Sequence, residues 1–274
     1  TDYVVHLQPG GATANLQGWV TVDNQSGATY RDAKLKLLAG DVNRVRERPE
    51  MFSRMAPAAA KAADAGFAEE SLFEYHLYTL QRPATVRDRE IKQLSLLEAA
   101  GLKVQKNLVV EFPSVGIGGP SEGTISLKPA VEIEFLNVAT NGLGVPLPKG
   151  IVKVYQSDQS GSVQMLGEDS IEHTPKEEKV VLRIGQSFDI VAERKQTSYT
   201  RQGDRGARTS FEVELRNRKD TPETVLVTES APGQWRIIEE SQPSKKLDAA
   251  RFQYTVALKA NETKKIRYTL EIRW

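Results

Sequence analysis

Apolar and polar side chains alternate along much of this chain with a period of two residues. In residues 266–273 (IRYTLEIR) every second residue is large and apolar, and residues 252–258 and 211–216 repeat the pattern. Successive side chains of a β-strand point to opposite faces of a sheet, so this period is typical of a strand with one buried face. The sequence therefore predicts a mainly β protein, an antiparallel β-sandwich.

Turn-forming sequences separate the expected strands at short intervals. Residues 157–161 (SDQSG) lie between two apolar segments, 151–155 and 163–166, which predicts a β-hairpin. Residues 219–222 (KDTP) and 260–263 (ANET) mark two further turns. Parallel crossovers need long connections, so short spacings of this kind favour sandwiches.

The length of the chain is that of two domains. It has 274 residues, and a domain takes roughly 150. We expect an irregular β-sandwich domain over residues 1–182, which contains an alanine-rich insertion. An immunoglobulin-like β-sandwich is expected over residues 183–274.

The alanine-rich segment, residues 50–70, breaks the β pattern because it contains eight alanines. Alanine has the highest helix propensity, so a short helical or mobile insertion is expected here. The alternative is a docking element in which Met51, Phe52, Met55 and Phe67 contact a partner.

Composition excludes several classes of function. The chain has no cysteine and only three histidines, His6, His76 and His173, which lie far apart in the sequence. We therefore expect no metal site and no cofactor. Its 37 basic and 36 acidic residues nearly cancel, which argues against a nucleic-acid partner. No apolar run approaches the roughly 18 residues that a membrane span needs.

The densest group of acid–base side chains is Glu168, Asp169, Glu172 and His173. Carboxylates beside a histidine can serve as acid and base when their environments separate their pKa values. A hydrolase that uses these residues is therefore the alternative function. A solvated strand edge explains the same residues without chemistry, so we assign no catalytic residues and favour a protein that is not an enzyme.

Residues 194–219 carry eight basic and three acidic residues, a net charge of +5. Gly203 and Gly206 predict a hairpin tip in the middle of this segment. Arg201, Arg205 and Arg208 would then form a basic hairpin that binds an anionic surface polymer or an acidic protein surface. The alternative is a solvated hairpin whose arginines pair with neighbouring carboxylates.

Residues 143–150 (LGVPLPKG) combine prolines, which fix φ, with glycines, which permit turns. We expect a rigid connection that maintains the packing between the two β-domains. A binding groove at that junction is the alternative, because ligand sites favour domain interfaces.

Several segments together carry a family resemblance: residues 143–150, 152–155 (VKVY), 166–171 (LGEDSI), 173–175 (HTP) and 188–194 (FDIVAER). In these segments the chain resembles the bacterial domain of unknown function 4139 family, the C-terminal region of mucoidy-inhibitor-like proteins. Residues 18–40 look like the opening strands of that family.

The resemblance implies an exported bacterial protein of the cell envelope, located in the periplasm. It also implies an N-terminal domain and a coiled coil before this region. A chain that starts at Thr1 fits a fragment or a processed form, and its missing N-terminal region is an expected partner. The family has no established reaction, so no catalytic residue carries over. Our leading hypothesis is a non-enzymatic envelope module that acts by protein–protein or surface-polymer interaction.

Overall fold

The computed structural model describes residues 1–40, 60–61, 67–116 and 119–274. Among these residues the regular elements are strands, apart from one 3-10 turn, η1 (Ala139–Asn141). The prediction of a mainly β, sandwich-like protein is confirmed. Most of the expected insertion at 50–70 lies outside the described residues. Its described parts belong to strands, β5 (Ala60–Lys61) and β6 (Phe67–Leu72).

The chain divides into two compact units, each made of two separate stretches. Unit 1 is Thr1–Gln105 with Ile133–Leu182, and unit 2 is Lys106–Glu132 with Arg183–Trp274. The expected division at residue 183 therefore coincides with one border of unit 2. The segment Lys106–Glu132, which we expected in the first domain, belongs to unit 2 instead. The borders fall within three strands, β10 (Gln105–Glu111), β12 (Ala130–Leu136) and β15 (Lys179–Gln186).

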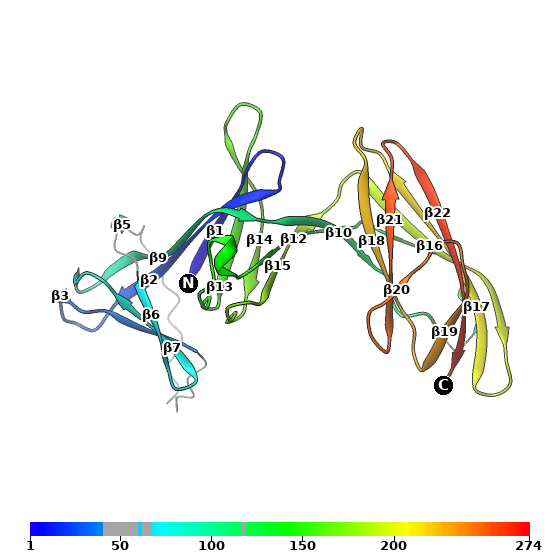
Figure 1. Ribbon diagram of the computed structural model, residues 1–274, viewed down its shortest axis with the longest axis horizontal. Helices are drawn as coiled ribbons and strands as arrows, with labels where there is room; N and C mark the ends of the chain where they lie inside the picture. Colours follow the sequence, from blue (N-terminus) through cyan, green and yellow to red (C-terminus); the bar gives the residue numbers. More distant parts are fainter. Residues whose placement is uncertain (41–59, 62–66, 117–118) are drawn as a thin grey trace. The chain divides into compact units, whose positions relative to one another are not determined.

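The main sheet of unit 1 has the strand order β14-β13-β1-β2-β9-β5 (Figure 1). Its strands are β1 (Asp2–Leu7), β2 (Thr13–Asn24), β9 (Glu90–Lys103), β13 (Gly150–Ser157), β14 (Val163–Ile171) and β5. The hairpin predicted at residues 157–161 is confirmed, since β13 pairs with β14. The parallel pairing of β1 with β13 departs from the antiparallel expectation, because strands distant in sequence become neighbours.

Two small sheets complete unit 1. One has the order β4-β7-β6, from β4 (Lys36–Ala39), β7 (Tyr75–Leu80) and β6, and the other pairs β3 (Tyr30–Ala33) with β8 (Ala84–Val86). Inward-facing side chains of β1, such as Tyr3 and Val5, are buried with Tyr78 of β7. These short sheets bring loops from distant parts of the sequence to the same surface.

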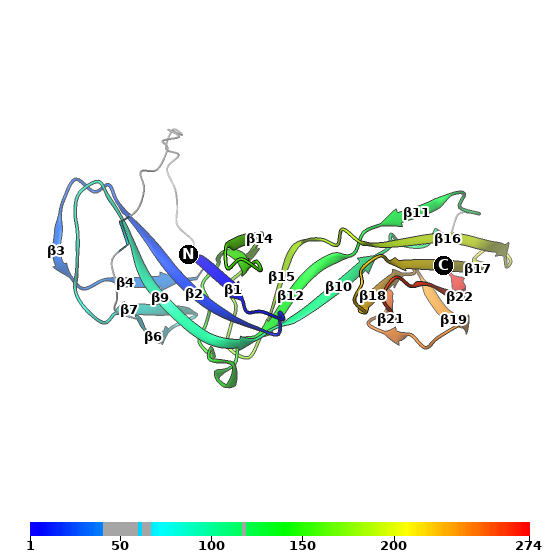
Figure 2. The ribbon, with the colours of Figure 1, turned by 90° about the horizontal axis from the view of Figure 1, so that it is seen from above.

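Unit 2 is a sandwich of two sheets. One holds the neighbours β10, β18 (Glu223–Ser230), β21 (Arg251–Leu258) and β20 (Lys245–Lys246). The other has the order β11-β16-β17-β22-β19, from β11 (Thr124–Leu127), β16 (Ile190–Arg201), β17 (Gly206–Asn217), β22 (Thr263–Arg273) and β19 (Gln234–Glu240) (Figure 2). The pairing of β10 with β18 is parallel.

The core of unit 2 is continuous and rich in aromatic rings. Phe252 packs edge-on against Tyr254 and Tyr268, and Phe211 stacks on Tyr268 with ring centroids 5.4 Å apart. These residues come from the three segments with the clearest period of two, which are the strands β21, β22 and β17. The alternation therefore identified both the strands and their buried faces.

Candidate functional site

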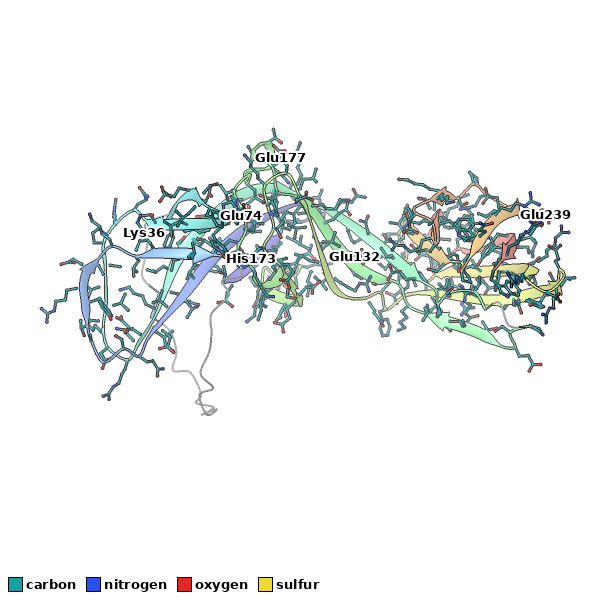
Figure 3. All side chains as sticks on the ribbon, turned by 90° about the horizontal axis from the view of Figure 1, so that it is seen from below. Lys36, Glu74, Glu132, His173, Glu177 and Glu239 are labelled. Atoms are coloured by element: carbon teal, nitrogen blue, oxygen red, sulfur yellow. The ribbon has the colours of Figure 1, made fainter. Side chains whose placement is uncertain are left out.

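A hollow of about 270 Å³ on unit 1 is lined by both His76 and His173. Glu74 and Tyr78 line it from the β6–β7 turn and β7, and Pro146 lines it from the loop before β13. A neighbouring hollow of about 430 Å³ shares Ala39, Gly40, Tyr78, Pro148 and His173 with it. We call the two together the histidine-lined hollow. Figure 3 labels Glu74, His173 and Lys36, which line it.

The proline-containing wall of this hollow is held by one buried side chain. Asn137 is fully buried, and its amide donates to the carbonyl oxygens of Val145 and Pro175, each at 2.8 Å. Its own side-chain oxygen accepts a hydrogen bond from the Gly144 N–H at 3.0 Å. Leu147 and Thr174 also bond through their backbones in both directions. Residues 144–148 and 173–175 are thereby fixed as one wall.

Two tyrosines fasten the same wall to the strands beneath it. The Tyr78 hydroxyl donates to the Pro146 carbonyl and the Tyr3 hydroxyl to the Pro148 carbonyl, both at 2.7 Å. Burial raises the pKa of Tyr78, and the charge of Glu69 raises it further. Burial raises the pKa of Tyr3 as well. Both hydroxyls therefore keep the protons that they donate.

Gly144 has a steric reason to be glycine. Its φ is +84°, and a Cβ at this position would lie 2.7 Å from the backbone nitrogen of Ala139. A side chain here would force the loop away from Asn137. This explains the Leu-Gly start of the segment 143–150.

The two histidines offer different hydrogen-bonding groups to the hollow. The Nδ1 atom of His76 lies 2.7 Å from the Glu69 carboxylate, which can only accept, so Nδ1 carries a proton. The Nδ1 atom of His173 accepts from the Lys149 N–H at 3.2 Å, so the neutral ring carries its proton on Nε2. Neutral His76 thus has an accepting Nε2 and His173 a donating one, and neither Nε2 has a partner among the described residues.

The acidic residues of the hydrolase hypothesis are not brought to this hollow. Of Glu168, Asp169, Glu172 and His173, the structure places only His173 on the lining that it describes. Glu172 pairs instead with Lys149 at 2.8 Å, and the Asp169 carboxylate accepts from the Ser170 N–H. A carboxylate pair with His173 at one reaction centre is therefore not formed by these residues.

Residues 143–150 lie wholly inside unit 1, so they do not connect two domains as we expected. They form a wall of the hollow. Neither His76 nor Glu74 was among the site residues expected from the sequence. One signal was present, since the period of two in β7 places His76 and Tyr78 on the same face of that strand.

Within the described residues, no group of three or more histidine, aspartate or glutamate side chains is placed to hold a metal ion. His6 lies on β1 and does not line the hollow that His76 and His173 share. Over the same residues, no helix has the length and apolar character that a membrane crossing requires.

The basic hairpin forms as predicted, because β16 and β17 pair and their turn spans residues 202–205. Arg201, Arg205 and Arg208 are exposed near its tip. The Arg201 guanidinium donates to the Gly203 carbonyl at 3.1 Å, and Arg208 lies 3.9 Å from Glu271. The structure gives Arg205 no ion-pair partner among the residues it describes.

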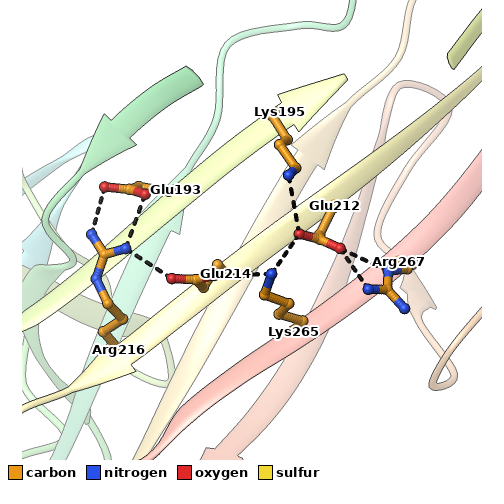
Figure 4. Close-up of polar contacts among 7 residues, drawn as sticks. All are labelled: Glu193, Lys195, Glu212, Glu214, Arg216, Lys265 and Arg267. Atoms are coloured by element: carbon orange, nitrogen blue, oxygen red, sulfur yellow. Dashed lines mark hydrogen bonds and ion pairs between the residues drawn. The ribbon is translucent and has the colours of Figure 1, made fainter. Parts of the chain in front are cut away.

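Four of the other five basic residues of this segment, Arg194, Lys195, Arg216 and Lys219, form ion pairs with carboxylates. Figure 4 shows a ladder of alternating charges on β16, β17 and β22: Glu193, Lys195, Glu212, Glu214, Arg216, Lys265 and Arg267. Hydrogen bonds from Lys265 and Arg267 lower the pKa of Glu212 to about 2. Arg216 in turn lowers the pKa of both Glu193 and Glu214. Of the acids in the ladder only Glu193 lies outside the basic segment, but Glu229 and Glu223, which pair with Arg194 and Lys219, lie outside it as well. Counting charges along the segment therefore overstated its free positive charge.

Comparison with protein-family models, curated proteins and solved structures finds no match to this chain. The family resemblance drawn from the sequence stays a prediction, and function has to be argued from the site itself.

Proposed function

We propose that this chain is a non-enzymatic β-sandwich module of the bacterial cell envelope that acts by binding. Its site is the histidine-lined hollow, and its partner there is an extended segment of another protein. The observation that carries the proposal is that His76 and His173 line one hollow, each with Nδ1 engaged by the protein and Nε2 without a partner among the described residues. With both rings neutral, Nε2 of His76 accepts a hydrogen bond and Nε2 of His173 donates one.

A peptide group complements this pair because it offers one N–H donor and one C=O acceptor. The two parts of the histidine-lined hollow share five lining residues, so together they form a continuous surface that suits an extended chain. Asn137 and Tyr78 hold the wall in place before a ligand binds, so binding costs little conformational entropy in the protein.

Selection of a random dodecapeptide display library on the immobilised chain tests this proposal. Fluorescence polarisation then gives the affinity of each selected peptide for the wild type and for a His76→Phe/His173→Phe variant. We expect the double variant to weaken binding by about tenfold or more, as for loss of central anchoring contacts. The matched control is Glu168→Gln, an exposed change on β14 outside the hollow.

Peptides that bind the double variant as tightly as the wild type would overturn the site, and failure to select any peptide would overturn the partner class. Hydrogen exchange of the double variant shows whether unit 1 keeps its fold. Fractionation of the natural host tests the envelope assignment separately, since recovery of the protein in the cytoplasm contradicts it.

A further inference from the structure

The outer face of the main sheet in unit 1 carries a second hollow, of about 310 Å³. Its lining includes Trp19 of β2, Val4 of β1, and Ile151 and Tyr155 of β13. The opposite side chains of these strands, such as Val5 and Val154, are buried, so this is the outward face. Such a face is ordinarily polar, yet Ile151 on it remains 48% exposed.

Polar groups at this hollow have hydrogen-bonding capacity that the protein does not use. The Trp19 indole, the Tyr155 hydroxyl and the Lys153 ammonium have no hydrogen-bond or ion-pair partner among the described residues. On the same face the Nε2 atom of His6, which is paired in register with Tyr155, is buried without a partner. Aromatic rings and hydrogen-bonding groups without a partner therefore occur together at this hollow.

The register sets what can bind here. Asp2 lies between Ile151 and Trp19 across three strands, and Val4 lies beside Lys153. The backbone of β1 is paired on both sides, with β13 and with β2. A peptide cannot add to this face as a further strand, so recognition has to come from side chains. One acid and one base, Asp2 and Lys153, leave the hollow without a net charge that selects an ion.

We propose that this face, which we call the aromatic face, binds the neutral pyranose units of a glycan. A pyranose ring has an apolar face of C–H groups that packs on an aromatic ring, and a rim of hydroxyls that both donate and accept hydrogen bonds. Trp19 and Tyr155 supply the rings, which are large, rigid and polar at one end. Lys153 donates to hydroxyl oxygens and Asp2 accepts from hydroxyl groups. The residues differ from those of the histidine-lined hollow, so this inference does not rest on the proposed function.

Isothermal titration with cellohexaose, maltohexaose and hexa-N-acetylchitohexaose tests the proposal. We expect at least one of these neutral hexasaccharides to bind the wild type. Trp19→Ala and Tyr155→Ala should each weaken that binding by about tenfold or more. Tyr155→Phe keeps the ring and should retain most of the affinity. The matched control is Tyr30→Ala, which removes a tyrosine that is 49% exposed in the same unit and outside this hollow.

Three results would overturn the proposal: no binding of any of the three sugars, undiminished binding by Trp19→Ala and Tyr155→Ala, or an equal loss in Tyr30→Ala. Hydrogen exchange of β1 and β13 verifies that each variant is folded. The His76→Phe/His173→Phe variant should bind the sugar normally, and Trp19→Ala should bind selected peptides normally. Failure of one site is therefore distinguishable from failure of the other.

Discussion

In unit 2, charged side chains of β16, β17 and β22 pair with one another across the sheet, and Arg194 pairs with Glu229 in the interior. In unit 1, His76, His173 and Trp19 lie at hollows with hydrogen-bonding groups that have no partner among the described residues. The charged ladder of unit 2 is thus paired within the protein. Unit 1, whose charge is less dense, has hydrogen-bonding groups at its hollows that are left without a partner among the described residues. We therefore place the candidate sites at hollows with unpaired hydrogen-bonding groups, and not where charge is densest along the sequence.

The largest expected effect concerns the buried pair of unit 2. The side chains of Arg194 and Glu229 are 5% and 0% exposed, and Arg194 also donates to the Pro113 carbonyl at 2.9 Å. Glu229→Ala leaves a guanidinium that cannot lose its proton, so it should lower the free energy of unfolding by about 3–5 kcal/mol. Unfolding in denaturant, with hydrogen exchange of β16 and β18 as the readout, measures this free energy.

A double replacement provides the control for that prediction. Arg194→Met/Glu229→Met removes both charges and should recover most of the loss. Arg194→Met alone should lower the free energy of unfolding by less than Glu229→Ala does. Burial raises the pKa of Glu229 to about 7, so a carboxyl left without its arginine can take up a proton and become neutral. Equal costs for the two single variants would contradict this asymmetry.

The second effect, in unit 1, is on the wall of the histidine-lined hollow. Asn137→Ala leaves two carbonyls and one N–H without their partner and should destabilise unit 1 by about 3 kcal/mol. Amide exchange should rise in residues 143–148 and 174–178. Asn141→Ala, which removes another buried asparagine from unit 1, should leave exchange in those two segments unchanged. Unaltered exchange in Asn137→Ala would show that the wall is held in another way.

The ladder of unit 2 should make stability depend on acid pH. Glu212 has its pKa lowered from 4.5 to about 2, so the folded state binds the proton less readily than the unfolded chain. Its contribution is present above pH 4.5 and is lost as the pH falls towards 2. Urea unfolding between pH 6 and pH 2.5 should show a shallower decline for Glu212→Gln than for the wild type. Parallel curves would indicate that the ladder contributes nothing.

The smallest effect is expected at the basic hairpin. Replacing Arg201, Arg205 and Arg208 by glutamine should change the free energy of unfolding by less than about 0.5 kcal/mol, because these side chains are exposed at a turn. Thermal unfolding of the triple variant measures this. Heparin binding that the wild type shows and the triple variant lacks would instead support the hairpin as a binding site for polyanions.

Prediction from sequence succeeded where the signal was local. The alternation in residues 211–216, 252–258 and 266–273 identified β17, β21 and β22, and turn chemistry identified the β13–β14 and β16–β17 hairpins. It failed where position depends on distant partners. Lys106–Glu132 joins unit 2 because β10 pairs with β18, more than a hundred residues later in the chain.

The candidate sites divide in the same way. Sequence alone determined that the chain is mainly β and that Arg201, Arg205 and Arg208 lie on a hairpin near its tip. Only the tertiary structure decided that His76 and His173 share a hollow, and that Trp19 and Tyr155 share a sheet face. The physical reason is that the side-chain period of a strand is a property of each residue and its neighbours, whereas contacts between strands depend on pairing and register.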